Sequence, residues 1–370
     1  MPIDSIIPAV DPMPLPAPFW LFKLLLIFTF ILHIIAMNFM LGGGIVAFFT
    51  RLFSKSENHK RLFEDTSRKI PSLLAATITL GVAPLLFVQV LYGQFFYTSS
   101  ILMAWPWFLV IVLLTLGYYG FYTISLKGRP TSGWVIWIML VSLILIMTIG
   151  FFYSNNFTLM QAPERWAAKY QADPSGWNLN WEEHTLIPRF LHFLVGAIAV
   201  GSFLIVLSGL FRWKKEQPYA KFLITYGGKW FMYTTMVQFV VGVWFLISLP
   251  QSKMMLYLGQ NMLATVCLLV GIMGALGAIF VMSGAVRNED PRRGAITAMG
   301  LTTLVLVAMA IMRDILRSSY LAPYFKAENL VVKTQWGVLF LFLLLLIIGL
   351  VVWLVMIKKY FFTPGARMPE

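Results

Sequence analysis

Long runs of apolar residues separated by short polar connections cover most of the chain. A helix that crosses the hydrocarbon core of a membrane needs about 20 mainly apolar residues. Nine runs meet this requirement: Phe19 to Phe49, Ile70 to Tyr97, Ile101 to Leu126, Trp134 to Tyr153, Ile187 to Phe211, Phe222 to Leu249, Met254 to Val286, Ile296 to Met312 and Trp336 to Ile357. The pattern predicts an all-α polytopic membrane bundle of nine transmembrane helices.

The composition supports a membrane protein. Hydrophobic residues make up 59% of the chain and charged residues only 12%, at a mean hydropathy of +0.79. Soluble domains carry about a quarter charged residues, so a soluble enzyme is excluded. The single cysteine, Cys267, excludes a disulfide framework and a Cys-based zinc or iron–sulfur site. We expect residues 1–370 to form a single membrane domain, with one long external connection over residues 154–188, between the fourth and fifth runs.

The basic residues indicate the orientation in the membrane. Of the 28 Lys and Arg, 18 lie in one set of alternating segments and 8 in the other. Cytoplasmic loops hold the excess of such residues, so we expect the N-terminus outside and the C-terminus in the cytoplasm of a cell inner (cytoplasmic) membrane. The basic loops are short and lack interleaved aromatic residues, which favours attraction to anionic lipid and argues against nucleic acid, despite a net charge of +13.

Histidines are the candidate chemical groups within the spans, since no Asp or Glu lies deep in any run, and that absence argues against an ion-driven transporter. His33 lies in the middle or outer half of the first run, and Met37, Met40 and Gly42 to Gly44 follow it. An imidazole at that depth must be hydrogen-bonded or bound to a metal. We consider two interpretations: a haem ligand, or a histidine bonded to a neighbouring helix.

A second histidine suggests a haem with two different axial ligands. His192 lies near the outer end of the fifth run, and the small residues Gly196 and Ala199 follow near the same helix face. Haem iron accepts His and Met as an axial pair. Met262 is expected near the same outer surface, so His192 and Met262 are the predicted pair, although a single methionine is by default core filler.

Two charged residues just after the eighth run can be interpreted either as an ion pair or as part of a haem site. Asp314 and Arg317 are one helical turn apart and can form an ion pair at the outer interface. Alternatively, the arginines of this segment, Arg313 and Arg317, neutralise haem propionates and the aspartate contacts an iron.

These residues together resemble subunit I of the cytochrome bd quinol oxidases, a family whose large subunit also has nine spans. The resemblance rests on His33 followed by Gly42, Leu80-Gly81-Val82 with Gln89 and Gly93, Met160-Gln161-Ala162-Pro163, Phe190-Leu191-His192, Gln260-Asn261-Met262, and Asp314 with Arg317. It implies that His33 and His192 bind haem and that Met262 is the second ligand of the His192 haem. It also implies that Asp314 and Arg317 are cofactor-binding residues, since they lie where the family has a glutamate and the arginine of its Gly-Arg-Gln-Pro-Trp signature.

The sequence departs from that family in three places. The third run has no acid where the family has two glutamates, the family's Gly-Arg-Gln-Pro-Trp reads Leu316 to Tyr320, and Pro250 to Lys253 replaces its long quinol loop. These absences argue against oxygen reduction and quinol oxidation.

We therefore expect a subunit that carries one or more haem b groups in a respiratory electron-transfer complex. It would act with other membrane subunits, an external c-type cytochrome or iron–sulfur protein, lipid and a quinone. A divergent terminal oxidase and a haem-free anchor or transporter are the alternatives.

Overall fold

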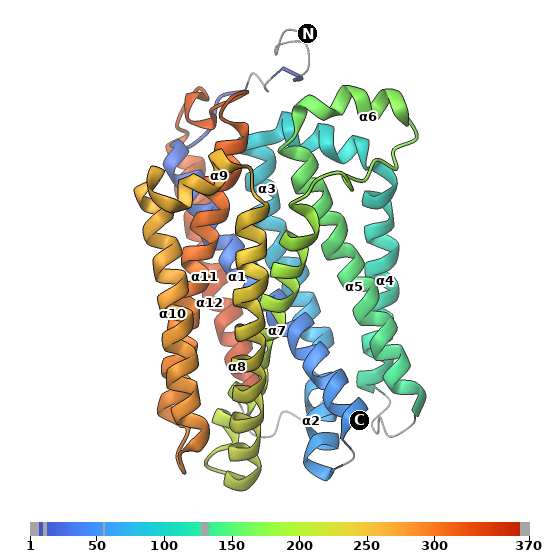
Figure 1. The fold of residues 1–370 in the computed structure, drawn as a ribbon, viewed down its shortest axis with the longest axis vertical. Helices are drawn as coiled ribbons and strands as arrows, with labels where there is room; N and C mark the ends of the chain where they lie inside the picture. The colour runs from blue at the N-terminus through green and yellow to red at the C-terminus, as the bar shows by residue number, and fades with distance from the viewer. Residues whose placement is uncertain (1–6, 10–12, 55, 127–132, 363–370) are drawn as a thin grey trace.

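The protein is a bundle of membrane-length helices, shown by a computed structural model that describes residues 7–9, 13–54, 56–126 and 133–362, with the side chains of residues 357 and 360–362 left out (Figure 1). Nine helices in the described residues are long and apolar enough to cross a membrane. The long helices are α1 Phe19–Phe53, α3 Ile70–Leu102, α4 Ala104–Leu126, α5 Gly133–Met160, α7 Leu186–Arg212, α8 Gln217–Ser248, α10 Met262–Arg287, α11 Arg292–Leu321 and α12 Trp336–Phe362. The described residues contain no β-strand, so the prediction of an all-α multi-pass bundle is confirmed.

Several helices begin or end a few residues away from the predicted runs, and three of these differences change the connections or the site. Helix α5 continues to Met160, so the expected loop over residues 154–188 begins later and contains two short helices, η2 Pro163–Arg165 and α6 Trp166–Ala172. The expected seventh run is divided into α9 Gln251–Met255, the π-helical turn η3 Leu256–Gln260 and α10. Helix α11 extends nine residues beyond Met312, because its last turns bury Asp314, Leu316 and Arg317 against the bundle.

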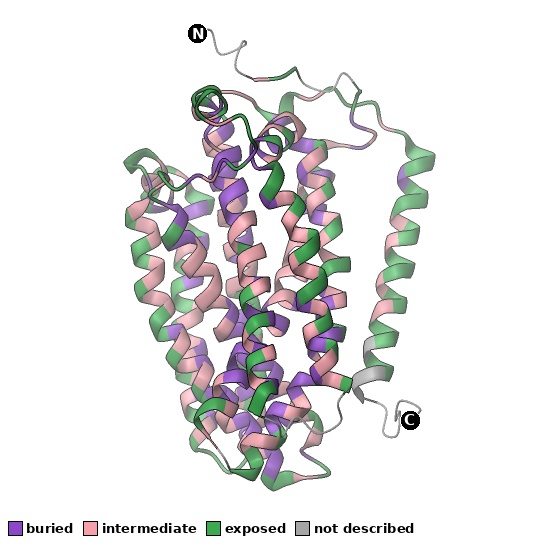
Figure 2. Cartoon of the chain, turned by 90° about the vertical axis from the view of Figure 1, so that its right-hand side faces the viewer, coloured by how far each residue is buried: buried purple, intermediate pink, exposed green. Residues whose placement is uncertain are grey.

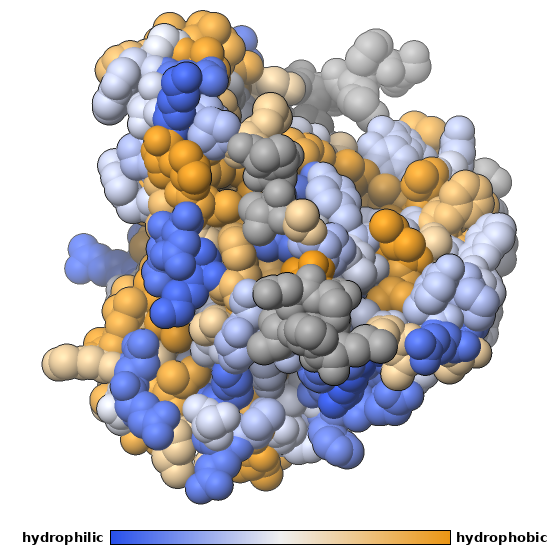
Figure 3. Space-filling model, turned by 90° about the horizontal axis from the view of Figure 1, so that it is seen from above, coloured by the Kyte–Doolittle hydropathy of each residue, from blue (hydrophilic) through white to orange (hydrophobic). Residues whose placement is uncertain are grey.

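Short helices mark the two ends of the bundle, which we call the α6 end and the α2 end. Helix α6 lies at the end where α1 begins, and the amphipathic α2, Glu57–Ser67, lies at the end where α1 finishes (Figure 1). Figure 3 shows the α6 end from above, where hydrophilic and hydrophobic side chains are interspersed. Trp177 and Trp181 are exposed there, which is typical of aromatic residues at a membrane interface.

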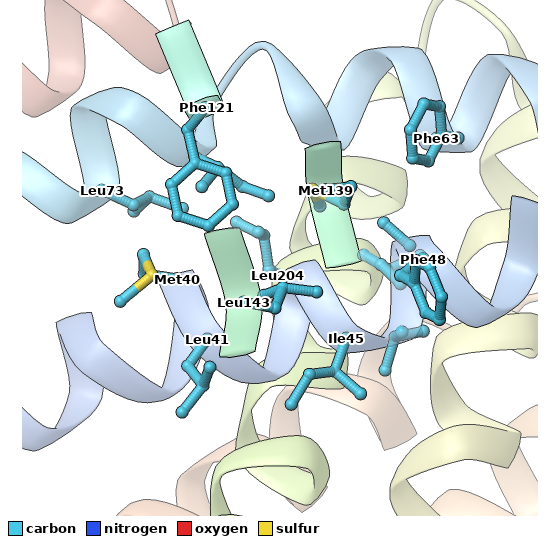
Figure 4. Close-up of a cluster of buried hydrophobic side chains, with 14 of the residues drawn as sticks. Met40, Leu41, Ile45, Phe48, Phe63, Leu73, Phe121, Met139, Leu143 and Leu204 are labelled. Atoms are coloured by element: carbon cyan, nitrogen blue, oxygen red, sulfur yellow. The ribbon is translucent and has the colours of Figure 1, made fainter. Parts of the chain in front are cut away.

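The two central helices α1 and α7 touch most closely at two glycines. A Cβ at Gly42 would overlap the carbonyl oxygen of Ala197, and one at Gly201 would lie 2.5 Å from the carbonyl oxygen of Asn38. Glycine is required where two helix backbones approach this closely. Around this crossing every residue from 40 to 48 of α1 and from 199 to 206 of α7 is buried. We call these two stretches the packed layer, part of which is drawn in Figure 4.

Closer to the α6 end, the same two helices are incompletely covered. No residue from 30 to 35 of α1 or from 190 to 196 of α7 is buried, and all are partly exposed. Successive helical residues point about 100° apart, so each stretch samples the whole circumference of its helix. A helix with one protein-facing side and one lipid-facing side would instead alternate between buried and exposed residues. We call these two stretches the histidine layer, since they contain His33 and His192.

Helix α12 stands beside the bundle and makes little contact with it (Figure 2). Leu339 is buried, and it is the only such residue among the described side chains of α12. The segment before the helix is held at the α6 end by a hydrogen bond from the Leu15 amide to the Val331 carbonyl and one from the Lys333 amide to the Leu15 carbonyl. The chain itself therefore leaves nearly all of this apolar helix to lipid or to another membrane protein.

Candidate cofactor-binding site

The first histidine of the histidine layer is held by helix α3. Its Nδ1 lies 3.0 Å from the backbone carbonyl oxygen of Thr77. A carbonyl oxygen only accepts hydrogen bonds, so the His33 Nδ1 must carry the proton and donate it. In a neutral imidazole the other nitrogen, Nε2, is then an unprotonated acceptor. This tautomer, with Nδ1–H donated to a backbone carbonyl, is the one that metal-ligating histidines commonly adopt.

A glycine of α3 makes room for the His33 ring. A Cβ added at Gly81 would lie 2.8 Å from the ring Cε1 and 2.9 Å from Nδ1. Real Cβ atoms do not approach other heavy atoms this closely, so a larger residue would move the ring. Thr77 and Gly81 lie one helical turn apart on α3. One turn of α3 therefore sets both the position and the tautomer of His33.

The second histidine faces a different helix. The Gln238 Nε2 lies 3.0 Å from the His192 Nδ1 and donates a 2.9 Å hydrogen bond to the backbone carbonyl of the same histidine. The ring also lies against Phe245 of α8, with centroids 5.8 Å apart. The Gln238 Oε1 is buried and has no hydrogen-bond partner among the described residues. His192 is thus held between α7 and α8, whereas His33 is held between α1 and α3.

The two histidines occupy equivalent positions relative to the helix crossing. His33 precedes Gly42 by nine residues, and His192 precedes Gly201 by nine residues. Both helices run from the α6 end to the α2 end (Figure 1). At about 1.5 Å per residue, each imidazole is about 14 Å along its helix from the crossing. The two rings therefore lie at a similar depth in the membrane.

The structure does not bring Met262 to His192. Met262 is the first residue of α10, and its side chain is 82% exposed. The Asn261 side chain caps this helix by accepting a hydrogen bond from the Ala264 amide, which fixes the direction in which α10 starts. His192 instead contacts α8, through Gln238 and Phe245. The geometry gives no support to the predicted axial pair of His192 and Met262.

Asp314 and Arg317 lie in a buried ion network, as the simpler of the two interpretations expects. The Arg317 guanidinium is paired with Asp314, and the Lys23 Nζ lies 2.8 Å from the other oxygen of that carboxylate. Lys23 also donates a 2.9 Å hydrogen bond to the Ser318 hydroxyl. The Arg317 guanidinium lies 4.9 Å from the ring centroid of Tyr92. Both carboxylate oxygens of Asp314 are occupied by cations, which leaves this residue poorly placed as an iron ligand.

Sequence reasoning missed several residues that hold these groups. Thr77 contributes only its backbone, so its residue type carries no signal. Lys23 does give a signal in the sequence, because a lysine inside an apolar run needs a charged or polar partner. Arg189 and Arg313 are both near the histidine layer: Arg189 precedes His192 by one turn, and the Arg313 guanidinium lies against the ring of Phe30, a residue of that layer. Within the described part of the chain, no three His, Cys, Asp or Glu side chains come together as a metal site.

The chain was compared with protein-family models and with curated protein sequences. No protein-family model matches the chain, and no curated protein matches it in sequence.

Proposed function

We propose that the chain is a haem b-carrying subunit of a respiratory electron-transfer complex in the cell inner membrane. The observation that carries the proposal is the state of His33. Its Nδ1–H is donated to the Thr77 carbonyl, so Nε2 is left as an acceptor, and no protein donor to Nε2 is found among the described residues. The helix positions around it are partly exposed on every side. An imidazole held in this way is suited to ligate an iron.

A bound haem would supply one-electron oxidation and reduction at its iron. The chain's own residues would set how that iron is held. Thr77 fixes the tautomer of His33, and a hydrogen bond from the far side of a ligating ring raises its basicity. Gly81 lets the ring lie close to α3. The surrounding apolar helices exclude water, which influences the reduction potential.

His192 is the second haem-ligand candidate, with Gln238 orienting its ring. The proposal does not include Met262 or Asp314 as iron ligands, because the first is exposed and the second is paired with Lys23 and Arg317. The partners we propose are other membrane subunits, an external c-type cytochrome or iron–sulfur protein, and a quinone. The uncovered surface of α12 supports a membrane partner. The excess of Lys and Arg in the connections at the α2 end supports that end as the cytoplasmic face and the α6 end as the external one.

The test is an optical spectrum of the purified chain before and after reduction with dithionite, together with iron and haem analysis. We expect a reduced haem b spectrum that is lost or strongly diminished in His33→Ala. A matched control is His59→Ala, since His59 lies in α2 at the opposite end and contacts Ser56. A colourless, iron-free wild-type protein would contradict the proposal and leave both histidines as hydrogen-bonding residues of a membrane scaffold.

A further inference from the structure

The α6 end of the bundle contains more positive charge than the protein itself neutralises. Five cationic side chains of this region and the three carboxylates paired with them carry the argument. The cations are Lys23, Arg165, Arg189, Arg313 and Arg317, of which Arg189 and Arg317 are buried, and the carboxylates are Glu164, Glu183 and Asp314. Glu164 and Glu183 are paired with Arg165, and Asp314 is shared by Lys23 and Arg317. Arg189 and Arg313 are left without a carboxylate partner among the described residues.

Within the described structure, the Arg189 side chain donates hydrogen bonds only to neutral groups, and Glu183, a carboxylate in its surroundings, is paired with Arg165. The Arg189 Nη1 donates to the Gln161 side-chain oxygen at 3.2 Å, and its guanidinium lies 5.5 Å from the ring centroid of Phe245. The residue is 7% exposed, and its Nε has no hydrogen-bond partner among the described residues. A buried guanidinium is costly unless it is paired and its donors are satisfied.

Arg313 lies between two aromatic rings. Its guanidinium is 4.4 Å from the ring centroid of Phe30 and 4.8 Å from that of Phe157. No hydrogen bond or ion pair to a protein acceptor holds it within the described part of the chain. Stacking between two rings fixes the plane of a guanidinium and leaves its N–H donors available at the edges.

The three arginines lie in one region of the bundle. Arg313 and Arg317 are one helical turn apart on α11. Phe245, whose ring lies 5.5 Å from the Arg189 guanidinium, packs against the same buried cluster as Met312, Ile315 and Tyr320 of α11. The Arg317 Nε and the Tyr320 hydroxyl are also buried without a hydrogen-bond partner in the described structure. Unused donors therefore surround an excess of positive charge, which is the arrangement that binds an oxyanion.

We propose that Arg189, Arg313 and Arg317, with the Tyr320 hydroxyl, form a binding site for a carboxylate or phosphate group near the α6 end of the membrane. Arginine suits this role because its planar donors match both kinds of oxyanion. Two sources supply such a group in a membrane: the phosphate of an anionic phospholipid and the propionates of a porphyrin. The inference does not rest on the proposed haem function, since a phosphate would satisfy the same donors.

The test compares matched anionic and neutral probes on the purified protein. Dihexanoyl-phosphatidylglycerol is compared with dihexanoyl-phosphatidylcholine, and haemin with its dimethyl ester, in which the propionate charges are removed. We expect the anionic member of at least one pair to bind more tightly and to raise the Tm. The pair that shows the difference identifies the source, and a phosphatidylglycerol effect in a haem-free protein would support the inference while contradicting the haem function.

Variants connect the binding to these arginines. Arg313→Gln and Arg189→Gln should each weaken binding of the anionic probe about tenfold, through loss of a charge-assisted hydrogen bond. Arg293→Gln, at the opposite end of α11 and exposed, should bind as the wild type does. If Arg313→Gln does not fold, Arg313→Lys keeps the charge, removes the planar donors and should still bind more weakly. Equal binding of anionic and neutral probes in both pairs, or equal binding by wild type and variants, would overturn the proposal.

Discussion

The packed layer and the histidine layer belong to the same two helices and differ in how closely they are packed. In the packed layer, α1 and α7 touch at Gly42 and Gly201 and every residue of the two stretches is buried. Figure 4 shows some of these buried side chains, among them Met40, Ile45 and Leu204. In the histidine layer, nine residues nearer the α6 end, no residue is buried and each histidine is held by a different neighbouring helix. Two helices that cross at a point separate on either side of it. The crossing therefore provides close packing, whereas the histidine layer leaves both imidazoles partly exposed.

The largest effect is expected from filling the crossing. Gly42→Ala would place a Cβ against the Ala197 carbonyl, which belongs to a backbone and cannot rotate away. Overpacking a tight contact costs about 1–3 kcal/mol and sometimes more, and we expect about 3 kcal/mol here. Thermal unfolding in detergent should show a clear fall in Tm. Gly300→Ala on α11 is the control, because a Cβ there has no neighbour within 4 Å. Equal Tm values for the two variants would show that the close crossing is not the main source of stability.

Breaking the ion network near the α6 end should have an intermediate effect. Lys23→Met leaves Asp314 with only Arg317, and the carboxylate side chain is 8% exposed. Removing one partner of a buried pair costs about 3–5 kcal/mol, which we reduce to about 2 kcal/mol because Lys23 is 23% exposed and Arg317 remains. The measurement is again the Tm in detergent.

A surface pair provides the control for this ion network. Lys60→Met removes an exposed pair with Glu57 and should change the stability by less than about 0.5 kcal/mol. The double variant Lys23→Met/Asp314→Asn should lose less than the sum of the two single variants, because both changes remove the same interaction. If the stability losses of the two single variants simply added up in the double variant, Lys23 and Asp314 would not stabilise the fold through a shared interaction.

A small change in the histidine layer should affect the cofactor more than the stability. Gly81→Ala pushes on the His33 ring, which is a side chain in a region with incomplete packing, so we expect a stability loss below about 1 kcal/mol. Haem content per chain should fall, since the ring is displaced from its hydrogen bond to Thr77. The control is Gly93→Ala on the same helix, where the nearest atom lies at an ordinary contact distance of 3.4 Å. A fall in Tm as large as that of Gly42→Ala, with unchanged haem content, would remove the distinction between the two layers.

The smallest effect is expected at the surface of the α2 end. Hydrogen bonds from the Arg292 side chain and backbone lower the pKa of the Asp290 carboxyl to about 2. A carboxyl whose pKa is lowered on folding contributes stability above its ordinary value near 3.9, and this is lost as the pH falls toward 2. Asp290→Asn should therefore lower the Tm slightly at neutral pH and match the wild type near pH 2, so that the variant loses part of the decline between pH 4 and 2. An equally steep decline in the variant would place the acid sensitivity elsewhere.

The helix count could be predicted because it depends on local composition. Each of the nine runs is apolar enough to satisfy the length and hydropathy that a membrane requires, whatever its neighbours are. The boundaries were less accurate where polar residues continue a helix: Asn155 and Asn156 extend α5 because both are buried, with Asn155 accepting a hydrogen bond from the Asn180 amide. Such partners are far apart in the sequence, so composition gives no signal for them.

The candidate site likewise has features that the sequence predicts and features that depend on contacts between helices. His33 and His192 were recognisable as candidates because an imidazole in an apolar run is costly without a partner. Which partner each has, and that Met262 faces outward while Asp314 is neutralised by Lys23, depended on contacts between helices.

The sequence by itself determined that this is a multi-pass helical membrane protein and which of its titratable groups lie in the membrane, because burial in lipid is decided residue by residue along each helix. Only the tertiary structure decided that two glycines bring α1 and α7 together, that the Thr77 carbonyl fixes the His33 tautomer, and that the guanidinium groups of Arg189 and Arg313 lie against aromatic rings. These features are set by the rotation and depth of each helix against its neighbours. In an environment where lipid is as apolar as the helices, those are governed by close packing and polar contacts, which the hydropathy pattern does not encode.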